Sequence, residues 1–102
     1  MSFTQLSEPE ILAELGRRLR RYRLQQNLTQ ADLARDAGVG NRTVRNLESG
    51  GDVQLGTLLR ILRALGRLDA LDAFLPRPGV SPMELLRSGG RERQRASASR
   101  DV

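Results

Sequence analysis

The stretch TQADLARDAGVGNRTVRNLESG, residues 29–50, constrains the fold most, because two helical patterns flank a short glycine-containing break. The apolar residues that recur at helical spacing are Leu33, Ala34 and Ala37 before the break, and Val44 and Leu47 after it. Thr29 with Asp32 three residues later is typical of a helix start. Gly38 allows a left-handed backbone, which costs a residue with a Cβ roughly 1 to 2 kcal/mol. The stretch therefore predicts two short helices joined by a tight turn, a helix-turn-helix.

Four further helical patterns accompany this pair, and we find no convincing strand alternation, so the predicted fold class is all-α. The additional helices are predicted over residues 7–26, 55–66, 69–75 and 81–88, with the pair itself at about 29–37 and 41–49. Ser7 with Glu10 three residues later predicts a capping box. The apolar faces predicted for the first and fourth helices are Leu12, Leu15, Leu19 and Tyr22, and Leu55, Leu58, Leu59, Leu62 and Leu65.

The second helix of the pair directs polar side chains away from its apolar face. The outward residues are Asn41, Arg42, Arg45 and Asn46. In a helix-turn-helix the N-terminal half of the second helix enters the major groove of DNA. Asn and Arg can form two hydrogen bonds at once with the edges of adenine and guanine. The pattern therefore predicts readout of double-stranded DNA.

Composition supports this prediction and weakens others. The net charge is +5, which suits a polyanionic partner. Every basic residue is Arg, which we interpret as a bias toward codons rich in G and C. Cys and His are absent, which excludes disulfides and argues against zinc. Lys is also absent and the carboxylates are scattered, so a Ser nucleophile has no evident base. We predict no enzyme activity and no cofactor.

The chain also lacks the apolar segments that membranes or secretion require. No apolar run approaches the roughly 18 to 20 residues that span a bilayer. The N-terminal sequence MSFTQLSEPE has no basic start followed by an apolar stretch, so it is not a secretory signal. We therefore expect a cytoplasmic, nucleoid-associated protein with no membrane partner.

Residue identities over half the chain resemble the Xre-type, lambda-repressor-like DNA-binding family. The matching segments are LGRRLRRYR (15–23), LTQADLARDAGV (28–39), TVRNLESG (43–50) and LLRILRALG (58–66). The resemblance implies a five-helix lambda-repressor-like domain with a helix-turn-helix. The expected domains are residues 1–76 for DNA binding, 77–88 for a short C-terminal helix that contacts a dimer mate or partner, and 89–102 for a disordered basic tail.

The resemblance also implies roles for individual residues. The residues expected to contact bases are Asn41, Arg42, Arg45 and Asn46. Those expected to contact the DNA backbone are Thr29, Gln30 and Thr43. A structural salt bridge is expected between Arg23 and Glu48. The RRLRRYR run is interpreted as a solvated helix face, with phosphate contact from Arg17 or Arg18 as the alternative. Two residues depart from the family pattern: Gly40 replaces the usual Ser or Thr cap, and Asp52 lies where a basic residue is common.

Together these observations predict a transcriptional regulator, an autoregulating repressor that binds a pseudo-palindromic operator as a homodimer. The alternative is a HipB-like antitoxin, which neutralises a HipA-like toxin kinase while repressing its operon. The predicted helix at 81–88 and the basic tail are the features that resemble such antitoxins. The apolar residues of this helix either pack back on the fourth helix or form a dimer seam. The basic tail is either a flexible end or an arm for a nucleic acid or partner.

Overall fold

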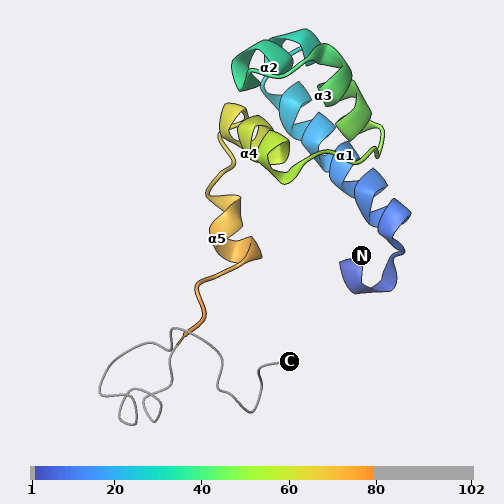
Figure 1. Cartoon of the computed structure of the whole chain (residues 1–102), viewed down its shortest axis with the longest axis vertical. Helices are drawn as coiled ribbons and strands as arrows, with labels where there is room; N and C mark the ends of the chain where they lie inside the picture. Colours follow the sequence, from blue (N-terminus) through green and yellow to red (C-terminus); the bar gives the residue numbers. More distant parts are fainter. Residues whose placement is uncertain (1, 80–102) are drawn as a thin grey trace.

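The computed structural model describes residues 2–79, in which short helices pack against one longer helix (Figure 1). The elements are η1 (Phe3–Gln5), α1 (Glu8–Gln25), α2 (Gln30–Ala37), α3 (Asn41–Glu48), α4 (Leu55–Ala64) and α5 (Ala70–Phe74). No strand occurs in this range, so the all-α prediction is confirmed for it. The helix expected at 81–88 and the tail at 89–102 lie outside the described residues.

Local signals determine where α1 begins and ends. The Ser7 hydroxyl accepts a hydrogen bond from the Glu10 amide at 3.3 Å, and the Glu10 carboxylate accepts one from the Ser7 amide at 2.9 Å. The predicted capping box is therefore confirmed. Past the other end of the helix, Asn27 has a left-handed backbone with φ of 58°. This turn reverses the chain into α2, which crosses the end of α1 (Figure 1).

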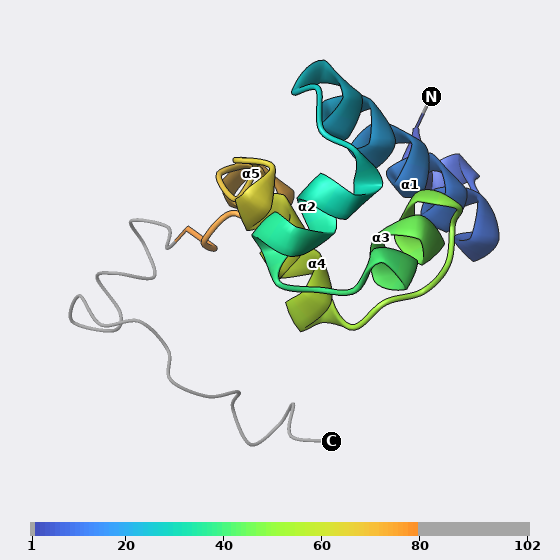
Figure 2. The same cartoon turned by 90° about the horizontal axis from the view of Figure 1, so that it is seen from above.

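The core lies where α1, α2, α3 and α4 meet. Its buried residues are Leu19, Leu33, Ala34, Ala37, Val44, Leu47, Ile61 and Leu65. α3 packs against both α1 and α2, and α2 packs against α4. Figure 2 shows α2 next to both α3 and α4. The apolar faces of α2 and α3 therefore point inward together, which leaves the opposite face of α3 at the surface.

The inward faces of α1 and α4 differ from the predicted ones. In α4, Ile61 is 1% exposed whereas Leu55 is 69% exposed, so the core-facing row runs through Leu58, Ile61 and Leu65. The prediction was wrong at Leu55 because apolar residues occupy two adjacent faces of this helix, and spacing alone does not choose between them. In α1, Leu15 is exposed.

The buried residues of α1 are Gly16, Leu19 and Arg23. Leu19 was predicted to be buried, but Gly16 and Arg23 each lie one residue after a predicted position, Leu15 and Tyr22. Neither Gly16 nor Arg23 has an apolar side chain, so the spacing of apolar residues did not identify the buried face.

The short η1 at the N-terminus was not predicted. Its Phe3 ring lies under the Arg18 guanidinium, whose carbon is 4.5 Å from the ring centroid. Among the described helices, none is long and apolar enough to cross a membrane.

α5 contributes nothing to the core. None of its residues is buried, and Phe74 and the following Leu75 are 72% and 71% exposed. These two side chains, with Leu55, are the largest exposed apolar groups of the C-terminal half of the described chain. Their exposure is unlike the tight packing of the first three helices.

Candidate nucleic-acid interface

The turn between α2 and α3 has the geometry that the sequence predicts. The Thr29 hydroxyl accepts from the Asp32 amide at 3.0 Å, and the Asp32 carboxylate accepts from the Thr29 amide at 2.9 Å, which caps the start of α2. Gly38 ends α2 with φ of 71°. The Val39 amide then donates to the Ala34 carbonyl at 2.9 Å, which fixes the turn onto α2.

α3 presents its polar side to solvent. Val44 and Leu47 are buried against the core, whereas Asn41, Arg42 and Arg45 are exposed. Within residues 2–79 neither Arg42 nor Arg45 is in an ion pair, although Arg17, Arg18, Arg23 and Arg35 each pair with a carboxylate. The two guanidinium groups on α3 therefore remain available to an external acceptor.

A buried ion pair attaches the C-terminal end of α3 to α1. Arg23 Nε and Nη2 donate to the two Glu48 carboxylate oxygens at 2.7 and 2.9 Å, and the side chains are 7% and 4% exposed. Arg23 Nη1 also donates to the Leu28 carbonyl at 2.7 Å. The hydrogen bond to Glu48 raises the pKa of Arg23, so this guanidinium stays charged. The pair has the structural position that the resemblance implied for it.

Close backbone contact reinforces this attachment. A Cβ added to Gly16 of α1 would lie 2.5 Å from the Leu47 carbonyl oxygen and 2.7 Å from that of Glu48. Only a residue without a side chain lets α1 approach the last turn of α3 this closely. Sequence analysis missed Gly16, because a single glycine inside a helical pattern does not identify its neighbour.

The predicted backbone-contacting residues fall into two groups. Gln30 lies at the first residue of α2, where its Nε2 donates to Glu48 Oε1 at 3.1 Å, and Thr43 lies half-buried on α3. Arg17 and Arg18 instead lie on α1 and share the Glu14 carboxylate, at 2.9 and 2.8 Å. Both arginines lower the pKa of Glu14, so this carboxylate is ionised and offsets their charge.

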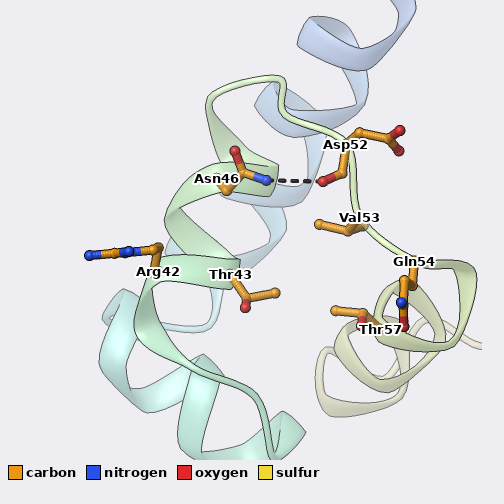
Figure 3. A pocket seen from close by; sticks show the side chains of 7 residues that line it. All are labelled: Arg42, Thr43, Asn46, Asp52, Val53, Gln54 and Thr57. Atoms are coloured by element: carbon orange, nitrogen blue, oxygen red, sulfur yellow. Dashed lines mark hydrogen bonds between the residues drawn. The ribbon is translucent and has the colours of Figure 1, made fainter.

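A groove of about 390 Å³ separates α3 from the start of α4 (Figure 3). Its lining residues are Arg42, Thr43, Asn46, Asp52, Val53, Gln54 and Thr57. In Figure 3 the Arg42 side chain extends away from the groove, whereas Thr43 and Val53 face into it. Asn46 Nδ2 donates to the Asp52 carbonyl at 3.0 Å. The groove therefore runs beside the outward face of α3, and one of the predicted base readers is bonded to its wall.

Comparison with known proteins agrees with this geometry. A family model described as helix-turn-helix matches residues 19–71, which include all of α2, α3 and α4. The chain belongs to the Xre-like helix-turn-helix family. Within that family it is similar to an uncharacterized HTH-type transcriptional regulator, y4mF, of Sinorhizobium fredii strain NGR234. The two are 44% identical over 55 residues, which are 53% of this chain and 72% of that protein. The family is one of DNA-binding transcriptional regulators.

Proposed function

We propose that this helix-turn-helix protein is a sequence-specific repressor that binds double-stranded DNA and controls its own promoter. The observation that carries the proposal is the exposed side of α3, where the Arg42 and Arg45 guanidinium groups have no ion-pair partner in the described part of the chain. Such groups can each form two hydrogen bonds with a guanine, and Asn41 can do so with an adenine. The net charge of +5 adds attraction to phosphates.

Phosphate contacts in this proposal come from the elements on either side of α3. Gln30 at the start of α2 keeps one amide hydrogen after bonding Glu48, and that hydrogen can donate to a phosphate oxygen. Thr43 offers its hydroxyl from the edge of the groove. With so few basic contacts, the affinity should fall only modestly with salt.

The active form in this proposal is a homodimer on a pseudo-palindromic operator. Each α3 would take one half-site, with half-site centres about 34 Å apart or a multiple of that distance. The adjacent Phe74 and Leu75, which are both exposed, support an association through α5, because neighbouring exposed apolar side chains often mark an interface. Residues 1–76 would supply the DNA-binding unit and 77–88 a contact to the mate.

Selection of duplexes from a random pool at physiological salt tests this function. The proposal expects enrichment of one motif with two inverted halves at the stated spacing. Retention of duplexes without any shared motif would contradict sequence-specific binding, and a single half-site would contradict the dimer.

The exposed apolar residues of α5 also support a second candidate, a HipB-like antitoxin that holds a HipA-like kinase toxin. This function requires a kinase to copurify with the full chain and to be lost when α5 and all that follows it, residues 70–102, are deleted. Copurification of no kinase from the native host would leave the repressor as the function.

A further inference from the structure

Asn46 differs from the other outward side chains of α3, because its amide is already bonded within the protein. Its Nδ2 donates to the Asp52 carbonyl at 3.0 Å (Figure 3). In the described part of the chain, the side chains of Asn41, Arg42 and Arg45 make no hydrogen bond. Of the four outward polar residues of α3, only Asn46 therefore has a side-chain hydrogen bond within the described part of the chain.

The connection between α3 and α4 closes around Asn46. The Gly51 amide donates to the Asn46 carbonyl at 2.8 Å, and the Ser49 hydroxyl is shared between the Arg45 carbonyl at 2.8 Å and the Asn46 carbonyl at 3.1 Å. The side-chain bond to Asp52 adds a third attachment one residue further on. Backbone and side chain of this single residue thus hold residues 49–52 against the last turn of α3.

Gly51 shows how closely the connection covers the Asn46 amide. A Cβ added at Gly51 would overlap both Oδ1 and Cγ of Asn46. Gly50, with φ of 92°, already provides the left-handed turn that follows a helix. The second glycine of the GG pair therefore serves a different need, which is space for the Asn46 side chain.

This arrangement opposes base readout by Asn46. An asparagine reads adenine by donating from Nδ2 and accepting at Oδ1 in the same plane. Here Nδ2 has used one of its two hydrogens on Asp52, and Oδ1, which would have to accept from adenine, lies against Gly51. Pairing with adenine would require Oδ1 to turn away from Gly51, which would displace the amide from the groove wall.

We propose that Asn46 is a positioning residue, which fixes the α3–α4 connection and thereby the shape of the groove, and does not read a base. The inference rests on the proposed DNA-binding function and deepens it, because it restricts base readout to Asn41, Arg42 and Arg45. The wall that Asn46 holds includes Asp52, Val53 and the N-cap of α4, Gln54. Backbone groups of this wall contact DNA without regard to sequence.

The test compares base preference in four variants on a library in which each base pair of the selected operator is varied. For Asn46→Ala we expect affinity to fall by a similar factor, roughly 2- to 10-fold, on every duplex, since one hydrogen bond that holds the wall is lost. The preference at each base pair should stay as in the unmodified chain. Arg42→Ala is the matched control from the same helix face, and its preference should relax at one base pair.

Gly51→Ala offers an independent way to displace the amide without altering Asn46 itself. It should also weaken binding to all duplexes alike, because the added Cβ pushes the Asn46 side chain off Asp52. The double variant Asn46→Ala/Gly51→Ala should bind no more weakly than Asn46→Ala, since the methyl group then occupies vacated space. Additive losses would overturn the proposed contact.

Two further outcomes would overturn the proposal. Relaxed preference at one base pair in Asn46→Ala, with the others intact, would show that Asn46 reads a base. Unchanged affinity and preference would show that the connection does not need it. If the variants unfold, hydrogen exchange at the Asn46 side-chain amide of the unmodified chain decides: protection before DNA is added supports the proposal, and rapid exchange overturns it. This last measurement needs no operator, so it separates failure of the inference from failure of the proposed function.

Discussion

α2 and α3 are both eight residues long, yet they are stabilised in different ways. α2 has a capping box at its start, from Thr29 and Asp32, and a left-handed glycine at its end. α3 begins after Gly40, and no side chain in the described structure caps it. Its last residue, Glu48, is instead bonded to Arg23 of α1. α3 is thus held in place by a residue of another helix, and its N-terminal turn has no side-chain cap in the described structure.

The largest effect that this comparison predicts comes from Glu48→Ala. The change leaves Arg23 buried and charged without its partner, so we expect the free energy of unfolding to fall by about 3 to 5 kcal/mol. Urea unfolding followed by circular dichroism measures the loss. The double variant Arg23→Met/Glu48→Leu is the control, since it removes both charges and should recover most of the stability. Equal losses in the single and double variants would mean that the charges are not the cause.

Gly16→Ala should cause the next largest loss of stability. Its new Cβ meets backbone oxygens of α3, which cannot rotate away, so we expect a loss of about 1 to 3 kcal/mol in unfolding free energy. Gly56→Ala on α4 is the matched control, because a Cβ there meets nothing within 4 Å. The control should unfold at the same or higher urea concentration than the unmodified chain. A Gly16→Ala variant as stable as this control would disprove the close approach of α1 to α3.

Substitutions at the two helix starts should have smaller and opposite effects. Thr29→Ala removes the capping oxygen of α2 and should cost about 1 kcal/mol. Gly40→Ser supplies α3 with a cap that it lacks in the described structure and should add a few tenths of a kcal/mol. Both changes are read from thermal or urea unfolding. A loss on Gly40→Ser would show that α3 needs glycine at this position for a reason beyond capping.

The smallest effect is a dependence of stability on pH that arises at the start of α2. The Thr29 backbone amide and hydroxyl lower the pKa of Asp32, so this carboxylate is ionised more readily in the folded chain than in the unfolded one. Its contribution to stability is present above the unfolded pKa, near 4, and is lost as the pH falls through the folded pKa. α3 has no acidic residue in its first turn.

Urea unfolding of the unmodified chain and of Asp32→Asn at several pH values measures this contribution. The difference between the two should be constant near neutral pH and should narrow below about pH 4. A difference that stays constant down to pH 3 would mean that the charge on Asp32 is not involved.

The sequence predicted the parts of the fold whose signals are local. Thr29, Asp32 and Gly38 identify both ends of α2 within a few residues, and the GG pair marks the end of α3. The inward face of α4 was harder, because Leu55 and Ile61 are both apolar and only contact with the other helices selects Ile61. Which face of a helix is buried depends on the helices that pack against it, and the spacing of apolar residues does not identify those helices.

The same distinction applies to the interface. Exposure of Asn41, Arg42 and Arg45 follows from the buried positions of Val44 and Leu47, so helical spacing was enough to predict it. The bond from Asn46 could not be predicted in this way, because its acceptor is a backbone carbonyl six residues later in an irregular connection. Every residue has a backbone carbonyl, so the pattern of side chains does not show which one accepts this hydrogen bond.

The most direct test of the account is the affinity of Arg42→Ala and Arg45→Ala for the selected operator, measured by fluorescence anisotropy beside their urea unfolding. Each variant should lose about 1 to 3 kcal/mol of binding free energy, because a guanidinium no longer reaches a base edge. Each should unfold at the same urea concentration as the unmodified chain, because both side chains lie outside the core. Unchanged affinity in both variants would contradict DNA readout by the exposed face of α3.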